Sequence, residues 1–222
     1  MAINRPQIIK AVYEGLGKVA KKPIPPTMSA HNDDLPDFEY NPQAAFELLA
    51  KAGYPEGFTT DLWAMPVAGP YMPTARKVAE VIQADLARIG IKVNIVTYEW
   101  ATYLSKTRNG EHSSCLLGWT GDNGDPDNFL YVLLSSAAIK SGSNRARYSN
   151  KAFDDLLLLG KRTADPAKRV EYYKQAQAIF HEDVPWVPIA HSMVIEPMRK
   201  FVMGFKLHPL GIRQFYPVWL DH

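Results

Sequence analysis

The sequence predicts an α/β fold, and three observations support this class. Helical segments with clear termini alternate with short segments rich in β-branched and aromatic residues. A strand, a helix and a second strand follow one another across 58–98, which predicts a βαβ unit with a right-handed crossover. The chain has 222 residues, of which 46% are hydrophobic and 22% are charged, and this composition suits one globular domain with a sizeable core.

Helix termini are marked mainly by proline and glycine. Asn41-Pro42 and Asp165-Pro166 each place an N-cap residue before a proline at the first helical position, where the missing N–H of proline costs nothing. The expected helices cover about 6–15, 42–53, 73–90, 150–160 and 166 onward.

Four segments are expected to be strands. Within one of them, Val93, Ile95 and Thr97 alternate with the residues between them, as in a half-buried strand. The Pro-rich stretch 22–26 is expected to be an extended connector, and 210–222 shows no periodicity of its own. The expected strands are 58–64, 92–98, 114–119 and 184–191.

Charge and cysteine content exclude several classes of function. The formal net charge is +2, so no strong field favours nucleic acid or an anionic membrane, and no nucleic-acid partner is expected. Cys115 is the single cysteine, which excludes an internal disulfide and a cysteine-rich zinc site. No apolar run approaches the ~18 residues of a membrane span. Residues 1–5 lack the apolar core of a signal peptide, so none is expected.

The most unusual segment is GWTGDNGDPDN (118–128), which follows an expected strand. Its aspartates suggest a calcium loop, but starting at either Asp122 or Asn123 fails to place ligands and glycine as an EF-hand requires. Asp125-Pro126 is instead expected to be an N-cap and the first residue of a helix. Asp122 has two interpretations: a carboxylate that receives a cationic group of a ligand, or a turn residue bonded to its own backbone.

Enzyme motifs give no support for catalysis. The sequence contains no G-x-S-x-G, P-loop, dinucleotide-binding or H-E-x-x-H motif. A metal at His112 and Cys115 would need further ligands from elsewhere, because no histidine pair has i, i+4 spacing. Asp122 and Asp125 are candidates for the acid and base of a hydrolase, but no nucleophile accompanies them. We therefore expect no catalytic residue, no metal and no cofactor.

Four aromatic residues fall near expected strand ends or in the loops that follow them: Trp63, Tyr71, Trp100 and Trp119. If those strand ends share one edge of the sheet, the rings would form the walls of a cleft beside Asp122. The alternative for each ring is a place in the core, where most Trp and Tyr side chains are at least partly buried.

Several segments together resemble one family. LWAMPVAGPYMP (62–73), IQADLARIGIKVNIVTYEW (82–100) and GEHSSCLLGWTGDNGDPDNF (110–129) closely resemble the C-terminal half of bacterial dipeptide-binding proteins. These proteins are the family 5 solute-binding subunits of ABC importers. MAINRPQIIKAVYEGLG at the start and AHSMVIEPMRKFVMGFKLHPLG (190–211) resemble the same family, in the same order.

The resemblance implies the C-terminal lobe of a periplasmic-binding-protein-like clamshell (type II, cluster C), with a mixed sheet flanked by helices. It divides the chain into a ligand-binding lobe over 1–209 and a tail over 210–222 that would return to an N-terminal lobe. The chain is accordingly expected to be one lobe of a longer protein. The expected partners are a small peptide, that N-terminal lobe and an ABC permease of the inner membrane. The implied location is the periplasm, or the cell surface as a lipoprotein in a Gram-positive organism.

The resemblance also implies a ligand site. Asp122 matches the aspartate that binds the α-ammonium group of the peptide, which is a strong charge-assisted contact in a desolvated cleft. The residues Trp119 to Gly121 match its neighbours in the pocket, and Tyr71 and Trp100 match aromatic wall residues. The expected ligand-binding residues are Asp122, Gly121, Thr120, Trp119, Trp100, Tyr71, Pro70 and Gly69.

Two features depart from the family pattern. Gly69 stands where the dipeptide binders carry an arginine that clamps the ligand carboxylate, so the ligand is expected to be longer, to be amidated, or to use another cation such as Arg76 or Lys77. Ser136 and Ser149 stand where paired cysteines are usual. The alternative to a peptide is haem, a cationic antimicrobial peptide or another amine-bearing nutrient bound by the same scaffold.

Overall fold

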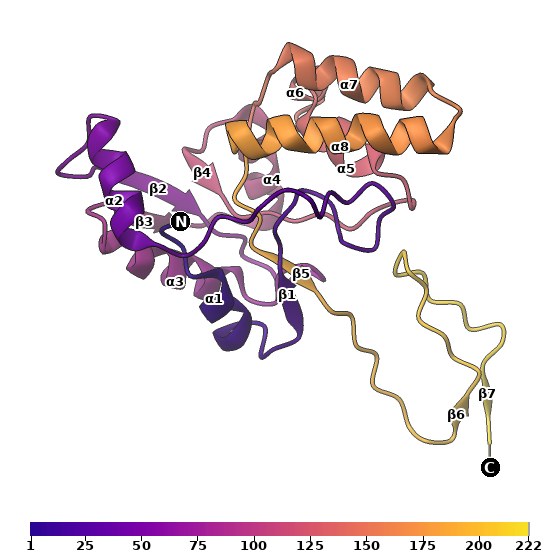
Figure 1. Ribbon diagram of the computed structural model, residues 1–222. Coiled ribbons are helices and arrows are strands. Elements are labelled where there is room, and N and C mark those ends of the chain that lie inside the picture. Colours follow the sequence, from indigo (N-terminus) through magenta and orange to yellow (C-terminus); the bar gives the residue numbers. More distant parts are fainter. Residues whose placement is uncertain (222) are drawn as a thin grey trace.

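The computed structural model describes residues 1–221 as two packed units and an extended arm (Figure 1). The first unit surrounds a three-stranded sheet, the second is a cluster of helices, and the arm begins after Ser192. Each unit has its own hydrophobic core, one built mainly from 2–116 and the other mainly from 129–180. The predicted α/β class is confirmed.

The three-stranded sheet is parallel, with the strand order β3-β2-β4. β2 (Thr59–Trp63) pairs with β3 (Lys92–Val96) along its whole length and with β4 (Ser114–Cys115) at its end. The predicted βαβ unit is confirmed, with α3 (Ala75–Ala87) as the crossover helix. β4 is shorter than the strand expected over 114–119, because its partner β2 ends at Trp63.

The other helices of the first unit surround this sheet. α1 (Arg5–Ala11) is shorter than the helix expected over 6–15, and α2 (Pro42–Lys51) matches its expected range. α3 packs against β3 and buries Val78 and Ile82. α4 (Trp100–Asn109) was not predicted from the sequence.

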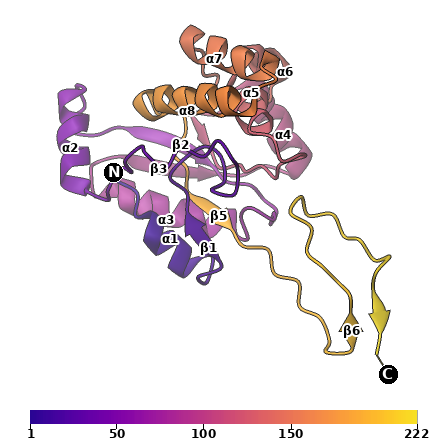
Figure 2. The same cartoon turned by 45° about the vertical axis from the view of Figure 1, so that its right-hand side comes forward.

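The second unit consists of four helices: α5 (Asp127–Leu134), α6 (Ala137–Ser141), α7 (Lys151–Arg162) and α8 (Pro166–Asp183). α7 and α8 lie side by side, and α5 packs against α7 (Figures 1 and 2). Among residues 1–221, no helix combines the length and the apolarity that crossing a membrane requires. The core of this unit includes Phe129, Leu130, Leu134, Phe153, Leu157, Tyr173 and Phe180.

The helix starts that the sequence predicts at Asn-Pro and Asp-Pro are confirmed. The side chain of Asn41 accepts a hydrogen bond from the backbone N–H of Ala44 at 2.9 Å. Asp165 accepts one from Ala167 at 2.9 Å. Asn150 caps α7 in the same way. Each cap satisfies backbone donors that have no partner within the first helical turn.

A second, antiparallel sheet pairs β1 (Gly17–Val19) with β5 (Ala190–Ser192). The strand expected over 184–191 is mostly wrong, since only its last two residues belong to β5. Pro185 and Pro188 have no N–H to donate to a ladder, and before Ala190 the backbone contact with the β1 side is one hydrogen bond among the described residues, from the N–H of Ala20 to the carbonyl of Ile189 at 3.2 Å. Strands of both orientations are therefore present, as expected of a mixed sheet, but the antiparallel pairs lie in sheets separate from the parallel one.

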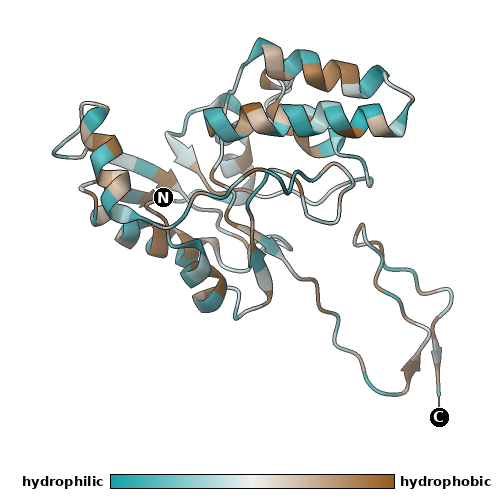
Figure 3. Cartoon of the chain, in the orientation of Figure 1, coloured by the Kyte–Doolittle hydropathy of each residue, from teal (hydrophilic) through white to brown (hydrophobic). Residues whose placement is uncertain are grey.

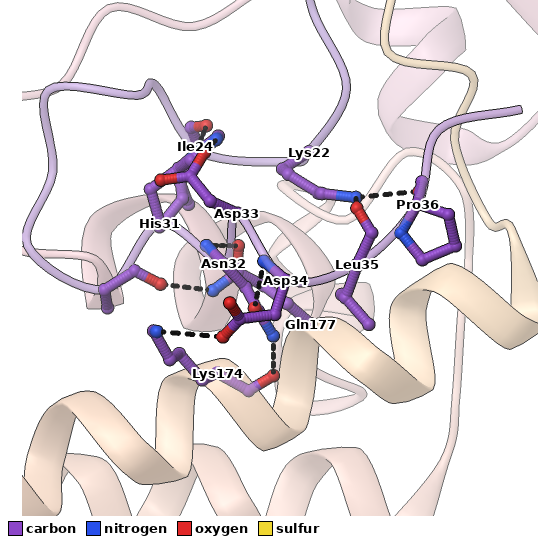
Figure 4. Close-up of polar contacts among 11 residues, drawn as sticks. Lys22, Ile24, His31, Asn32, Asp33, Asp34, Leu35, Pro36, Lys174 and Gln177 are labelled. Atoms are coloured by element: carbon purple, nitrogen blue, oxygen red, sulfur yellow. Dashed lines mark hydrogen bonds and ion pairs between the residues drawn. The ribbon is translucent and has the colours of Figure 1, made fainter.

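The loop between β1 and α2 is held by buried polar contacts and joins the two units (Figure 4). Lys22 is 3% exposed, and its ammonium group donates to the carbonyl oxygens of Leu35 at 2.7 Å and Pro36 at 3.0 Å. Gln177 of α8 donates to the carbonyl oxygen of Ala30 at 2.6 Å. The Pro-rich connector is thus part of a packed loop without regular secondary structure.

The arm, 193–221, contains a short antiparallel pair, β6 (Val202–Met203) and β7 (Trp219–Leu220). It extends away from both units (Figure 2). The tail expected over 210–222 forms its C-terminal part, except for His222, which lies outside the described residues. Hydrophobic residues recur along the arm (Figure 3). Exposed ones include Met193, Val194, Ile195, Met198, Phe201, Leu207, Ile212, Phe215, Tyr216, Trp219 and Leu220.

Candidate functional site

The glycine- and aspartate-rich loop connects β4 to α5 at the carboxyl end of the parallel sheet, where α/β proteins commonly bind ligands. α5 begins at Asp127, one residue later than predicted. Asp125 still accepts a hydrogen bond from the backbone N–H of Asp127 at 2.9 Å. The guanidinium of Arg169 on α8 contacts both oxygens of Asp125, with Nη1···Oδ2 2.7 Å and Nη2···Oδ1 2.9 Å. The end of the loop is therefore fixed to the second unit.

The ion pair determines the charge of Asp125. Burial raises the pKa of this carboxyl group, but the hydrogen bonds from Arg169 and from the N–H of Asp127 outweigh burial, so that the pKa lies below its ordinary value. Asp125 therefore stays ionised near neutral pH and engaged with Arg169. This arrangement does not support Asp125 as the acid or base of a hydrolase.

Asn128 organises the middle of the loop. It lies in the first turn of α5 and is 8% exposed. Its Oδ1 accepts hydrogen bonds from Nε1 of Trp119 at 2.8 Å and from the backbone N–H of Asp122 at 3.0 Å. Its Nδ2 donates to Oδ2 of Asp122 at 3.1 Å. The sequence pattern does not single out Asn128, because an asparagine close to an expected N-cap gives no separate signal of its own.

Asp122 is exposed to solvent, and both its backbone N–H and its carboxylate are hydrogen-bonded. Its carboxylate and its N–H both pair with the side chain of Asn128, so the turn-residue interpretation, in which Asp122 bonds to its own backbone, is not supported. Trp119 and Thr120 are also exposed, whereas Gly121 lies against the ring of Phe129. The loop thus presents one oriented carboxylate beside an indole ring.

Tyr71 forms a second edge of the site. Its ring lies directly on Gly118, where an added Cβ would be 2.1 Å from Cδ2 of the ring. Two hydrogen bonds hold the turn that carries Tyr71: the hydroxyl of Tyr13 donates to the carbonyl of Tyr71 at 2.8 Å, and the hydroxyl of Ser192 donates to that of Pro70 at 2.6 Å. Burial raises the pKa of Tyr71, so its hydroxyl remains protonated near neutral pH.

Gly69 adds no charge to this edge. Its backbone forms a bridge with Met72, and an added Cβ would be 3.2 Å from the ring of Tyr71. The two cations that the sequence offers as substitutes are exposed on α3. Arg76 forms an ion pair with Glu80 at 2.9 Å. Arg76 and Lys77 each line a shallow surface hollow that no residue of the loop 118–128 lines.

The predicted aromatic cleft is only partly present. Trp63 is 4% exposed and belongs to the core of the first unit, so its predicted role in a cleft wall is wrong. Trp100 begins α4 and stacks on Tyr103, with ring centroids 5.8 Å apart. Tyr71 and Trp119 lie at the loop itself, and a ligand contact from Tyr71, Trp119 or Trp100 stays a prediction.

The remaining candidate residues have structural contacts of their own. Burial raises the pKa of the Cys115 thiol to about 11, which keeps it protonated at neutral pH. Ser136 donates a hydrogen bond to Asp154, and Ser149 is exposed. Within the described part of the chain, no three His, Cys, Asp or Glu side chains are grouped as they would be around a metal ion.

Comparison with known proteins identifies the family. The profile of "Bacterial extracellular solute-binding proteins, family 5 Middle" matches residues 1–141. The chain belongs to this family. The family predicted from the sequence is therefore confirmed, and its members bind solutes.

Relatives and solved structures agree with this assignment. The dipeptide-binding protein of Escherichia coli is 51% identical over 220 residues, which are 99% of this chain and 41% of that protein. Heme-binding protein A of Haemophilus influenzae is 46% identical, and the match covers 99% of this chain and 40% of that protein. Among solved structures, the ABC transporter-associated periplasmic binding protein DppA from Helicobacter pylori, in complex with peptide STSA, matches with a TM-score of 0.91 and 39% identity. The match covers 100% of this chain and 42% of that protein. The chain thus spans about two fifths of the length of these relatives, and the predicted periplasmic-binding-protein fold is confirmed.

Proposed function

We propose that this family 5 chain binds a peptide, with Asp122 receiving the free ammonium group at its N-terminus. The observation that carries this proposal is the exposed carboxylate of Asp122, which is oriented by Asn128 beside the exposed indole of Trp119. An ammonium group donates charge-assisted hydrogen bonds to a carboxylate, and an adjacent aromatic face adds to the attraction. Because every unmodified peptide has this group, such a site accepts many sequences.

The relatives support a peptide as the ligand and transport as the role. One is named for dipeptide binding, and another is described as ABC transporter-associated and periplasmic, and holds a peptide. We extend these properties to this chain: it would deliver peptides to an ABC permease of the inner membrane. It would act in the periplasm, or as a cell-surface lipoprotein, together with an N-terminal lobe that closes over the ligand.

The far end of the ligand is expected to lie outside a dipeptide-sized site. Position 69 supplies no cation to a terminal carboxylate, and Arg76 is already paired with Glu80. A buried carboxylate without a partner is costly, so a ligand whose carboxylate stays in water, or is amidated, fits this site better. A peptide longer than a dipeptide meets this requirement.

The test is an NMR titration with three peptides of one sequence, which are unmodified, N-acetylated and C-amidated. We expect the unmodified and amidated peptides to shift the amide signals of 118–125, and the acetylated peptide to do so only at higher concentration. Asp122→Asn should weaken binding of the unmodified peptide about five-fold, or about 1 kcal/mol, because the carboxylate is exposed.

The control variant is Asp155→Asn, which removes an exposed carboxylate paired with Lys151 on α7. It should leave the affinity for the peptide unchanged. Equal binding of the acetylated and unmodified peptides would refute the ammonium site, and so would an unchanged affinity of Asp122→Asn.

Haem is the second candidate ligand. It is favoured by the 46% identity to Heme-binding protein A of Haemophilus influenzae. Adding haem to the chain and following its absorbance near 400 nm, together with mass spectrometry of the co-purified ligand, would separate haem from peptide.

A further inference from the structure

We propose that Asn128 is a positioning residue that determines the preference of the site for a free ammonium group. This inference rests on the proposed function. Asn128 touches no ligand in this view. It acts by fixing the two groups that do, the carboxylate of Asp122 and the indole of Trp119.

The chemistry of the amide explains why an asparagine occupies this position. Nε1 of Trp119 and the backbone N–H of Asp122 are both donors, so they require an acceptor, and Oδ1 of Asn128 supplies it to both. Oδ2 of Asp122 is an acceptor, so it requires the donor Nδ2. These partners therefore also determine the orientation of the Asn128 amide, that is, which of its two terminal atoms is the oxygen and which is the nitrogen.

No other common side chain of this size satisfies all three partners. An aspartate at 128 has no N–H for Oδ2 of Asp122 and would place two like charges side by side. A leucine would leave the indole N–H of Trp119 and the backbone N–H of Asp122 without an acceptor. Because Asn128 is 8% exposed, water cannot easily replace the lost bonds.

The network leaves one oxygen of the carboxylate for the ligand. Within residues 1–221, Asn128 is the side-chain partner of Oδ2 of Asp122, and Oδ1 of Asp122 receives no hydrogen bond. The indole of Trp119 has its N–H engaged with Asn128 and is 39% exposed. A cationic group with N–H donors can therefore meet a carboxylate oxygen and an aromatic ring that are already oriented.

Asn128→Leu tests this inference, with Asn123→Ala as its matched control. The leucine has the same branching and the same number of side-chain heavy atoms as asparagine, and it removes all three hydrogen bonds. Asn123 lies in the same loop, and its side chain accepts a different hydrogen bond, from the N–H of Asp125 at 3.0 Å. The control therefore perturbs the loop without touching the Trp119–Asp122–Asn128 network.

The readout is the ratio of the dissociation constants of the full 222-residue chain for the N-acetylated and the unmodified peptide. We expect Asn128→Leu to reduce this ratio at least three-fold, and Asn123→Ala to leave it unchanged. In the ligand-free chain, the indole N–H signal of Trp119 should shift in Asn128→Leu only. In an Asp122→Asn background, Asn128→Leu should not change the ratio further.

A purely structural role for Asn128 would weaken both peptides equally and leave the ratio unchanged, which would overturn the inference. An unshifted indole signal in Asn128→Leu would also overturn it. Failure of the proposed function would give a different result, because the unaltered chain itself would then bind both peptides equally. That result would also refute a role of Asn128 in selecting the ammonium group.

Discussion

At the scale of single residues, the shape of the site depends on the contact between Tyr71 and Gly118. A Cβ at 118 would lie 2.1 Å from Cδ2 and 2.3 Å from Cγ of the ring. These atoms are close to the backbone of Tyr71, so the ring cannot avoid the new methyl group by a small rotation. We expect Gly118→Ala to lower the free energy of unfolding by about 1–3 kcal/mol, as overpacking usually does, measured by urea denaturation.

The same loop provides the control. An added Cβ at Gly124 meets no heavy atom within 4 Å, so Gly124→Ala should change the free energy of unfolding by less than about 0.5 kcal/mol. If both variants were equally stable, the ring of Tyr71 would not rest on Gly118, and Tyr71 would not form the second edge of the site.

At the scale of elements, Arg169 connects α8 to the loop 118–128. Its guanidinium contacts both oxygens of Asp125, and its Nε donates to the carbonyl of Gly160 at 2.9 Å. Arg169→Met removes these contacts and keeps most of the apolar stem. Because the pair is partly exposed, we expect a loss of only about 1 kcal/mol in unfolding free energy, and line broadening of the amide signals of 118–125.

Arg76→Met is the matched control for Arg169→Met. Arg76 makes an exposed ion pair with Glu80 one helical turn away, which is expected to contribute less than about 0.5 kcal/mol. Equal losses in the two variants would mean that the Arg169–Asp125 contact is no stronger than an ordinary surface pair.

The helices and strands also differ in whether the sequence alone could predict them. The helices whose N-caps are Asn41, Asn150 and Asp165 are predictable, because the cap and the first turn are local features of the sequence. α4 is not, because its N-cap is Glu99, which is not among the preferred capping residues. β5 could not be placed either, since its pairing with β1 joins residues far apart in the sequence.

The residues of the candidate site likewise differ in whether the sequence alone points to them. The sequence singles out Asp122 as a candidate because glycines and aspartates are concentrated in one loop after a strand, but its ligand-binding role is implied only by the family resemblance. Asn128 is not singled out, since its role depends on how the folded loop returns to the first turn of α5. Trp63 was misplaced because a tryptophan at a strand end gives no signal of the face it occupies.

At the scale of the whole molecule, the two units differ from the arm in how they bury apolar residues. The units have separate cores, and the loop with Lys22 and Gln177 joins them. The arm exposes a series of large apolar side chains, among them Phe215, Tyr216 and Trp219. Exposed apolar surface of this extent is typical of an interface, and the predicted return of 210–222 to an N-terminal lobe would cover part of it.

The stability of the molecule is expected to depend on pH through His191, which lies in β5 opposite Lys18 of β1. Burial, and to a lesser degree the nearby His31, lower the pKa of His191 from 6.5 to about 4. Its Nε2 is buried and has no hydrogen-bond partner among the described residues. As the pH falls from 6.5 towards 4, the unfolded chain therefore binds a proton at this residue, whereas the folded chain does not, and the equilibrium shifts towards unfolding.

The full shift corresponds to about 3 kcal/mol at most, and burial of His112 lowers its pKa in the same direction. His191→Phe keeps a planar ring of similar size and removes the titrating group. We expect the unfolding free energy of this variant to fall less steeply between pH 7 and pH 4.5 than that of the unaltered chain, as measured by urea denaturation at several pH values. His208→Gln, in the arm, should keep the original slope. If the slope of His191→Phe matched that of His208→Gln, the unfolded state would gain no proton at His191 relative to the folded state, and the acid sensitivity would have to arise from other groups such as His112.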